Sequence, residues 1–429
     1  MSTRRWLLLL LAAALAARVL FCVLFPQGLP DGGVPNLDMY HHLAGTLLQD
    51  GTLRDLEGRL TAMREPGYPL VLAGLYAVSG PRYRAVLALH CLLGVLTVWL
   101  VWLLGLRLFG PRCAWLAALM AAFHPQLLYY TALPRRETFQ AFLLAWSVWL
   151  LLDALDFKDL WPLQRPGAPK GRRGWRTAGA PRWLLAGAIW ALNPLTNSAF
   201  LPAGLAAAAA AVLVGRSRSL DLRRGAGLFL AAYVALFALW PLRNASVFHR
   251  FIPGINGGGN HIYIGFIVPD DAAGTPGEQA YLRADATAQA AVKLSEEDKD
   301  ALFYRAALDW IRAHPAGFAK RLGGSFLKLW RLYPYPRDYG TSYRLIQWAS
   351  LLSDGWILPL ALIGLLLGCA RRPACWVPAS VLGAVTFTYM VFWAVIRYRV
   401  PLMPLVFPFA ACALERVGSA LRLWTQEDA

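Results

Sequence analysis

The chain has 429 residues, of which 57% are hydrophobic and only 16% are charged. Soluble domains carry about 25% charged residues, so the composition excludes an ordinary soluble protein and indicates an integral membrane protein. The net charge of +17 does not point to nucleic acid, because the basic residues stand in short clusters between apolar runs, as topology signals do. The six cysteines include no Cys-x-x-Cys pair, which argues against a disulfide framework or a zinc site.

Ten apolar runs approach or reach the roughly 20 residues that cross a bilayer. They lie at 6–25, 84–108, 113–130, 138–155, 182–194, 197–214, 226–242, 346–368, 374–396 and 400–416. The run at 182–194 is short, with a kink expected at Pro194. The first run resembles a secretory signal with small residues near Ala17, so its retention stays open. The sequence predicts an all-α polytopic membrane protein with about ten spans.

The positive-inside rule orients these spans. The basic clusters alternate with the apolar runs, and they lie at Arg4/Arg5, Arg107/Arg112, Lys158 to Arg182, Arg216 to Arg224, Arg371/Arg372 and Arg416/Arg422. Both termini are therefore predicted to be cytoplasmic, in an inner membrane. Segments 26–83, 131–137 and 243–345 and the corner at Arg397 then face the periplasm or exterior.

Three regions are expected. Residues 1–242 form a transmembrane catalytic core whose first outer loop, 26–83, carries interfacial helices. Residues 243–345 form a large outer loop, an embedded cap with an acidic turn at Asp270/Asp271, and residues 346–429 add the last spans. The segment 165–182 is predicted to be a flexible basic cytoplasmic loop, and no internal repeat is visible, which argues against an inverted-repeat transporter.

Titratable residues crowd the first outer loop. In PNLDMYHHLA (35–44), Asn36 is expected to cap a helix that runs to Gln49 and ends at Gly51. Asp38 and His42 are then four residues apart on one helical face. Two interpretations of Asp38 stay open, a carboxylate that favours the helix dipole or a catalytic base. The adjacent histidines are better explained as interfacial or supporting groups than as metal ligands.

The next outer segments bring further charges to the same side. In MREPGYPLVLAGLYAVSG (63–80), Glu65 precedes a second interfacial helix and is either a dipole-favoured or a catalytic carboxylate. In YYTALPRRETF (129–139), Arg135, Arg136 and Glu137 open the fourth span. The arginines suit a phosphate headgroup, and snorkelling to the interface explains them equally well.

Two later stretches add to this set. The segment 240–266 has Arg243 where a span meets the outer loop, and a glycine run, Gly257 to Gly259, that permits close approach of a ligand. It lacks the Gly-Lys-Ser/Thr of a nucleotide-binding P-loop. IRYRVPLMP (396–404) puts Arg397 and Arg399 at the start of the last span, where arginine is costly and indicates function.

The outer segments thus supply candidates of three kinds. The catalytic candidates are Asp38, Glu65 and Glu137, the phosphate ligands are Arg136, Arg243, Arg397 and Arg399, and the supporting residues are Tyr40, His42, Tyr68, Asn244, Asn256 and Asn260.

Several motifs recur in a familiar order. They are an outer-loop Asp-x-Tyr, Arg-x-Pro-Gly-Tyr-Pro, a carboxylate opening the fourth span, Pro-x-x-Arg-Asn with a downstream Asn-Gly-Gly, and Arg-Tyr-Arg-x-Pro-x-x-Pro. From Asp38 to Pro404 the chain resembles bacterial members of glycosyltransferase family 39. That family has the membrane-embedded GT-C fold and includes protein O-mannosyltransferases and the aminoarabinose transferase acting on lipid A.

The resemblance implies a polyprenyl-phosphate-sugar donor and an acceptor on the outer side. It implies that Asp38 is the catalytic base, that Glu137 is the acidic residue of the second outer loop, and that Arg243 and Arg397 hold the lipid phosphate. Met39 follows Asp38, in place of the Asp-Glu pair of protein O-mannosyltransferases, which weakens the case for a protein acceptor. The sequence leaves a lipid, a glycan and a protein open as acceptor, and it does not specify the sugar or the oligomeric state.

The residues also suggest a mechanism. A sugar on polyprenyl phosphate already has a good leaving group, so the reaction needs a base, Asp38, and cations for the phosphate. Direct displacement inverts the anomeric centre. No cofactor is required, and a divalent metal at Asp38, Glu137 and a histidine is not favoured. A transporter or flippase of a polyprenyl-linked glycolipid is the alternative, and separation of Asp38 and Glu137 beyond about 15 Å would exclude one shared catalytic site.

Overall fold

The computed structural model describes residues 3–29, 31–155, 179–216, 222–269, 276–334 and 343–420. Within these ranges the ordered elements are helices, and the sole β-type pairing is an isolated bridge between Arg54 and Leu60. The all-α prediction is confirmed. The predicted basic loop at 165–182 lies mostly outside the described residues, as does the acidic turn at Asp270/Asp271.

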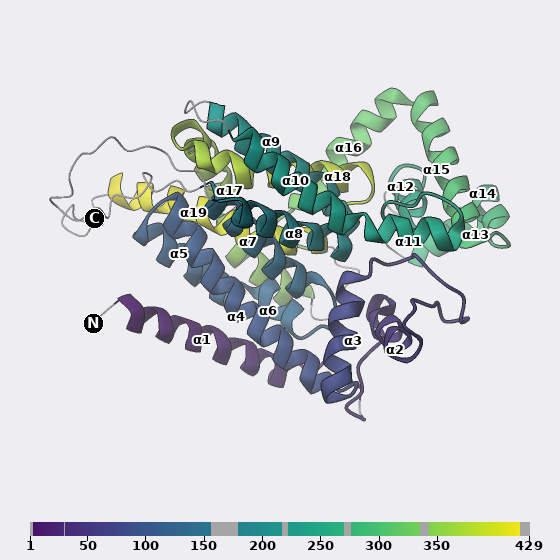
Figure 1. The fold of residues 1–429 in the computed structure, drawn as a ribbon, viewed down its shortest axis with the longest axis horizontal. Coiled ribbons are helices and arrows are strands. Elements are labelled where there is room, and N and C mark those ends of the chain that lie inside the picture. Colours follow the sequence, from purple (N-terminus) through teal and green to yellow (C-terminus); the bar gives the residue numbers. More distant parts are fainter. Residues whose placement is uncertain are drawn as a thin grey trace.

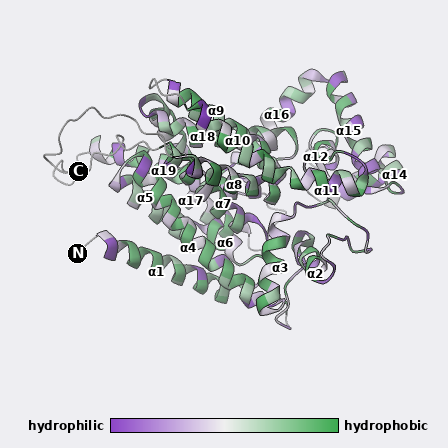
Figure 2. Ribbon diagram, viewed as in Figure 1, coloured by the Kyte–Doolittle hydropathy of each residue, from purple (hydrophilic) through white to green (hydrophobic). Residues whose placement is uncertain are grey.

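Long apolar helices form the body of the molecule (Figures 1 and 2). Seven helical segments of the described chain are long and apolar enough to cross a membrane. They contain α1 (Thr3–Leu24), α4 (Tyr83–Leu108), α9 (Leu201–Arg216), α10 (Arg223–Phe237) with α11 (Leu239–Phe248), α17 (Tyr343–Arg371), α18 (Trp376–Val391) and α19 (Met403–Ala420). The other three predicted runs form α5 (Pro111–Phe123) with α6 (Pro125–Thr131), α7 (Glu137–Ala154) and α8 (Ala180–Thr196). All ten runs are helical, and their number as spans stays a prediction.

The third predicted run is broken into two helices at His124. Pro125 has no amide hydrogen to donate to the carbonyl of Ala121, so the α-helical ladder cannot continue through it. The buried guanidinium of Arg18, from α1, donates to the carbonyl oxygens of Ala121 at 3.3 Å and Ala122 at 3.1 Å. One apolar helix therefore satisfies the carbonyl groups that the break in another leaves without partners.

Glycine allows two helix pairs to pack closely. A β-carbon at Gly187 in α8 would lie 2.1 Å from the carbonyl oxygen of Phe229 in α10, and one at Gly364 in α17 would lie 1.8 Å from that of Phe409 in α19. Neither distance is tolerable, so both positions require glycine. Such close backbone approach is typical of helix packing in membranes.

The segments predicted to face outward collect at one end of the bundle. This end carries α2 (Tyr40–Asp50) and α3 (Gly67–Ser79) of the first loop, and α12 (Gly258–Phe266), α13 (Pro276–Ala284), α14 (Ala286–Ala291), α15 (Glu296–Ala313) and α16 (Pro315–Trp330) of the cap. The start of α1 and the end of α19 lie at the opposite end (Figure 1). Segments that the basic clusters place on one predicted side are thus together in space.

The helix predicted to begin after Asn36 begins later. A short 3₁₀ turn, η1 (Leu37–Met39), comes first, and α2 starts at Tyr40 and ends at Asp50 before Gly51, whose φ is 67°. The side-chain oxygen of Asn36 nevertheless accepts a hydrogen bond from the amide of His42 in the first turn of α2, at 3.1 Å. The predicted end is confirmed, and the predicted shared helical face of Asp38 and His42 is wrong, because Asp38 precedes α2.

Candidate active site

Glu65 is fixed by a tight junction between α3 and the end of α8. A β-carbon at Gly67 would lie 2.5 Å from Oγ1 of Thr196 and 2.8 Å from the carbonyl oxygen of Leu195, so glycine permits this contact. Glu65 then reaches across the junction, and its carboxylate accepts from the amide of Ser198 at 2.6 Å and from Nη1 of Arg136 at 2.7 Å. Its side chain is 1% exposed, and both of its oxygens have a partner.

Asp38 is held in an unusual backbone conformation beside this junction. Its φ is 53° and that of Met39 is 66°, in the left-handed region that non-glycine residues rarely adopt. Such strain persists where the surroundings determine the conformation, and it is common at functional sites. Nε of Arg64 donates to the carbonyl oxygen of Asp38 at 3.2 Å. Its carboxylate lies 3.2 Å from Nε of Arg135.

Arg397 connects Asp38 with Glu137. It lies in η7 (Ile396–Leu402), just before the last long helix. Its Nη1 is 3.3 Å from Oδ2 of Asp38, and its Nε is 3.1 Å from Oε1 of Glu137. Glu137 is the first residue of α7, where a carboxylate is favoured by the helix dipole. Because one guanidinium contacts both carboxylates, they lie within the span of a single site.

These residues form one charged cluster with an excess of positive charge. The charged cluster comprises the carboxylates of Asp38, Glu65 and Glu137 and the guanidinium groups of Arg64, Arg135, Arg136 and Arg397. Burial acts to raise the pKa of Asp38, but the nearby guanidinium groups, that of Arg397 most strongly, hold the pKa below its usual 3.8. Asp38 is therefore ionised at neutral pH, and the extra positive charge suits an anionic ligand.

His261, in cap helix α12, faces the charged cluster and did not emerge from the sequence analysis. Burial, together with the positive charges of Arg64 and Arg136, lowers the pKa of His261 to about 4. Its ring lies 5.7 Å from that of Trp393, just before η7. Helix α12 thus contributes a neutral imidazole near the carboxylates. A histidine within an apolar stretch gave no signal in the sequence, because its partners come from distant segments.

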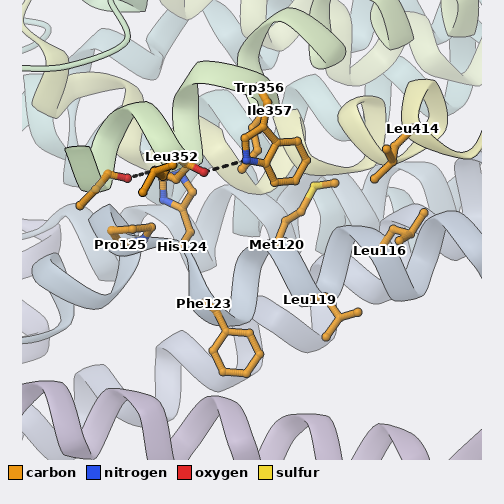
Figure 3. Close-up of a pocket in the computed structure, with 12 residues that line it drawn as sticks. Leu116, Leu119, Met120, Phe123, His124, Pro125, Leu352, Trp356, Ile357 and Leu414 are labelled. Carbon is orange, nitrogen blue, oxygen red and sulfur yellow. Dashed lines mark hydrogen bonds between the residues drawn. The ribbon is translucent and has the colours of Figure 1, made fainter. Parts of the chain in front are cut away.

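An apolar groove leads from Arg397 along the side of the molecule. Its first part, with a volume of about 320 Å³, is lined by Arg397 and by apolar residues of α1, α6 and α17, among them Phe21, Tyr129 and Ile346. A second part of about 480 Å³ shares Pro125 and Ala349 with the first and continues between α5 and α17. Figure 3 shows its wall, with His124 and Met120 on one side and Trp356 on the other.

The predicted supporting residues of the first outer loop, Tyr40, Tyr68 and His42, make contacts within the protein that hold this loop in place. Tyr40 and Tyr68 are buried in an edge-to-face pair with ring centres 5.0 Å apart, and the Tyr68 hydroxyl bonds Nε2 of His90 at 3.0 Å. They support the base of the first outer loop. Nε2 of His42 contacts the carbonyl oxygen of Asp55 at 2.8 Å, so this ring nitrogen is engaged within the first outer loop.

The Arg243 region is placed differently from the expectation. Arg243 donates to the carbonyl oxygen of Thr61 at 3.1 Å and to the side chain of Asn244 at 3.0 Å, and no direct contact with a carboxylate of the charged cluster is found among the described residues. The buried Asn244 donates to the carbonyl oxygen of Ile252 at 3.0 Å. These residues fasten the cap to the first outer loop.

The glycine run of the cap makes a close contact, but within the protein. A β-carbon at Gly258 would lie 2.2 Å from the hydroxyl of Tyr304, and one at Gly259 would lie 2.2 Å from the carbonyl oxygen of Asp300. Gly258 and Gly259 therefore let α12 pack on α15, and the approach of a ligand to the glycine run stays a prediction. The backbone amide of Asn260 donates to the carboxylate of Asp300. The backbone amide of the buried Asn256 donates to the carbonyl oxygen of Ala62 at 2.9 Å.

Arg399 does not join the charged cluster. It is fully buried and pairs with Asp354 of α17. The remaining predicted phosphate ligands, Arg136 and Arg397, do lie in the cluster. A group of three or more metal-ligating side chains is not found within the described ranges of the chain.

Comparisons with known proteins bear on this arrangement. Residues 64–164 match the family model "Dolichyl-phosphate-mannose-protein mannosyltransferase". The oligosaccharyltransferase AglB from Archaeoglobus fulgidus, in complex with an inhibitory peptide and a dolichol-phosphate, superposes with a TM-score of 0.57 at 18% identity, over 98% of this chain and 51% of that one. The chain has the GT-C fold of that archaeal structure. The predicted resemblance is confirmed at the level of the fold, and the family match covers residues 64–164.

Two further structures complete the comparison. The same archaeal enzyme tethered with an acceptor peptide gives a TM-score of 0.58 at 18% identity, over 98% of this chain and 50% of that one. ArnT from Cupriavidus metallidurans, bound to undecaprenyl phosphate, gives a TM-score of 0.41 at 17% identity, over 98% and 80%. The chain spans about half the length of the oligosaccharyltransferase structures. No curated protein matches its sequence.

Proposed function

We propose that this protein is an inverting glycosyltransferase that moves a sugar from a polyprenyl-phosphate-linked donor to an acceptor hydroxyl on the extracytoplasmic side of the membrane. The observation that carries the proposal is Arg397, which contacts Asp38 and Glu137 and also lines the end of an apolar groove. A base, a phosphate ligand and a place for a lipid chain thus meet at one residue.

The donor fits the groove and the charged cluster together. Its isoprenoid chain would lie along the apolar walls beside α6 and α17, and its phosphate would meet Arg397 and Arg135. Guanidinium groups bind phosphate through paired hydrogen bonds, and the cluster's excess positive charge offsets the phosphate charge. The dolichol-phosphate bound to the archaeal oligosaccharyltransferase supports this class of donor.

The chemistry follows from these positions. Asp38 takes the proton of the acceptor hydroxyl as its oxygen attacks the anomeric carbon. The bond from that carbon to the phosphate oxygen breaks on the opposite face, so the configuration inverts. Polyprenyl phosphate leaves with the bonding electron pair, and Arg397 and Arg135 stabilise the charge that develops on it.

Donor binding would also activate the base. Without a substrate, Arg397 and Arg135 pair with Asp38 and hold its pKa low, which makes it a weak base. An arriving phosphate competes for the same guanidinium groups. Asp38 then loses part of its positive surroundings, its pKa rises, and its proton affinity increases. Proton abstraction would therefore follow donor binding and would not precede it.

A transfer assay tests the proposal. The detergent-purified protein is incubated with a panel of polyprenyl-phosphate sugars and with membranes as the acceptor source, and release of free polyprenyl phosphate is measured. At least one donor should be consumed by the wild type and by Asp309→Asn, an exposed control in α15, but not by Asp38→Asn. The protein is also reconstituted into vesicles. Transport of intact glycolipid across these vesicles, with no donor consumed in the transfer assay, would instead establish a flippase.

A further inference from the structure

A second set of titratable residues is buried in the bundle, apart from the charged cluster. Asp354 of α17 contacts Nε2 of His124 through Oδ1, at 2.9 Å, and pairs with Arg399 of η7 through Oδ2. The three side chains are 0% exposed. His124, Asp354 and Arg399 are here called the buried triad.

The buried triad joins separate elements of the fold. His124 stands at the break between α5 and α6, Asp354 lies midway along α17, and Arg399 belongs to η7. Arg399 also donates to the carbonyl oxygen of Arg331 after α16. Removing charges from water is costly, so a buried pair of this kind adds little to stability over a well-packed apolar equivalent. Its more specific contribution is to fix how these elements sit against one another.

The segment that the buried triad fixes is the one that carries Arg397. A 3₁₀ helix has three residues per turn, so Arg397 and Arg399, two residues apart in η7, point to different sides. Arg397 points to Asp38 and Glu137, while Arg399 points to Asp354. Anchoring Arg399 therefore sets the rotation of η7 about its own axis, and with it the direction of Arg397.

The same triad lies under the apolar groove. His124 and Ser353, the neighbour of Asp354, both line its second part, and Pro125 and Ala349 line both parts. Figure 3 shows His124 beside Leu352 of the facing helix. A lipid chain in the groove would thus lie against α5, α6 and α17, the helices whose contact includes the pair of His124 and Asp354.

We propose that Asp354 is a positioning residue for the lipid phosphate: by holding Arg399 and His124 it aims Arg397 from η7 at the phosphate group of a polyprenyl lipid in the groove. This inference rests on the proposed function and adds to it a determinant of phosphate selectivity that does not touch the substrate.

The test compares two lipids that differ only in the phosphate. Binding of radiolabelled undecaprenyl phosphate and of undecaprenol is measured on the full-length protein in nanodiscs. The variants are Asp354→Asn, the charge-neutral double variant Asp354→Asn/Arg399→Gln, and Arg397→Gln. Glu415→Gln is the matched control, because it removes a carboxylate from α19, where Glu415 accepts a hydrogen bond from Cys113 at 2.8 Å.

The expected result is a loss of selectivity without a loss of lipid binding. The wild type and Glu415→Gln should prefer the phosphate lipid, and Asp354→Asn should lose at least tenfold in affinity for it while undecaprenol binding is unchanged. The double variant should regain thermal stability, because no buried charge is left unpaired, yet keep the low phosphate affinity. A merely structural role would instead weaken both lipids equally and be repaired in the double variant.

Two results would overturn the inference. Full phosphate selectivity in Asp354→Asn, with selectivity lost in Arg397→Gln, would show that Arg397 needs no support from the buried triad while leaving the proposed function intact. A wild type that binds both lipids equally would refute the proposed donor site and this inference with it.

Discussion

The buried pairing of Glu65 with Arg136 predicts a structural role in place of the catalytic and phosphate-binding roles expected from the sequence, and a double-mutant cycle can separate the two. Glu65 is 1% exposed and Arg136 is 15% exposed, and their closest atoms are 2.7 Å apart. Removing one partner of a buried pair typically costs about 3–5 kcal/mol, because the other charge stays buried without compensation. Glu65→Gln should fall near the lower end, at about 3 kcal/mol, because its amide oxygen can still accept from the amide of Ser198.

The cycle uses Glu65→Gln, Arg136→Gln and the double variant, measured as denaturant unfolding in detergent. The double variant should lose less stability than the two single variants together, with a coupling energy of about 1–3 kcal/mol. The transfer assay is run without denaturant, where the variant is folded. Glu65→Gln should keep most of the wild-type transfer rate, because both oxygens of the Glu65 carboxylate already have protein partners and neither is free to take a proton from an acceptor. A variant that unfolds like the wild type but has no transfer activity would contradict this reasoning and make Glu65 a catalytic residue.

Three further perturbations follow from individual contacts. Removing the positive charge in Arg135→Gln should raise the lowered pKa of Asp38 in the free protein, so the acid limb of kcat/KM, which reports the free enzyme, should move to higher pH in a pH–rate profile. Gly67→Ala would put a β-carbon 2.5 Å from Thr196, which should cost about 1–3 kcal/mol in an unfolding titration. Arg18→Leu deprives two carbonyl groups at the α5–α6 break of a donor and should cost about 2 kcal/mol or more, whereas an unchanged midpoint would show that another donor replaces the arginine.

Much of the fold could be predicted because it depends on local pattern. Apolar runs near the length of a bilayer became helices, and the charge clusters between them separated the two ends of the molecule. The end of α2 at Gly51 followed from glycine's tolerance of positive φ. The α5–α6 break did not emerge, although Pro125 was visible, because a proline in an apolar run also fits a continuous kinked span.

The site was predictable in its members more than in its contacts. Shared sidedness selected Asp38, Glu137 and Arg397, which the structure brings together across some 360 residues of chain (Asp38 and Arg397 are 359 apart). The predicted side of the membrane is the same for Arg397 and Arg399, so it could not show which of them belongs to the site. The two arginines differ in the side of the 3₁₀ helix that they face, and Arg399 faces Asp354. Asp354 was not expected to matter, because it is a single carboxylate in a largely apolar helix.

The glycine run and His261 show the same limit. Close approach at Gly258 and Gly259 was expected, and the partner that the structure shows there is α15. His261 gains its significance from charges contributed by other segments. In each case the sequence shows what a residue is able to do, such as permit close packing or change its charge. Which groups it packs against or interacts with depends on segments far away in the chain.

The measurement that tests the central claim most directly is lipid mass spectrometry on detergent-purified wild type and Asp38→Asn. If Asp38 is the base of a polyprenyl-phosphate-dependent transferase, the variant should retain an intact polyprenyl-phosphate sugar and the wild type should carry free polyprenyl phosphate. The same intact glycolipid on both proteins would contradict the account: Asp38 would have no catalytic role, and a carrier or flippase would explain the groove and the arginines better.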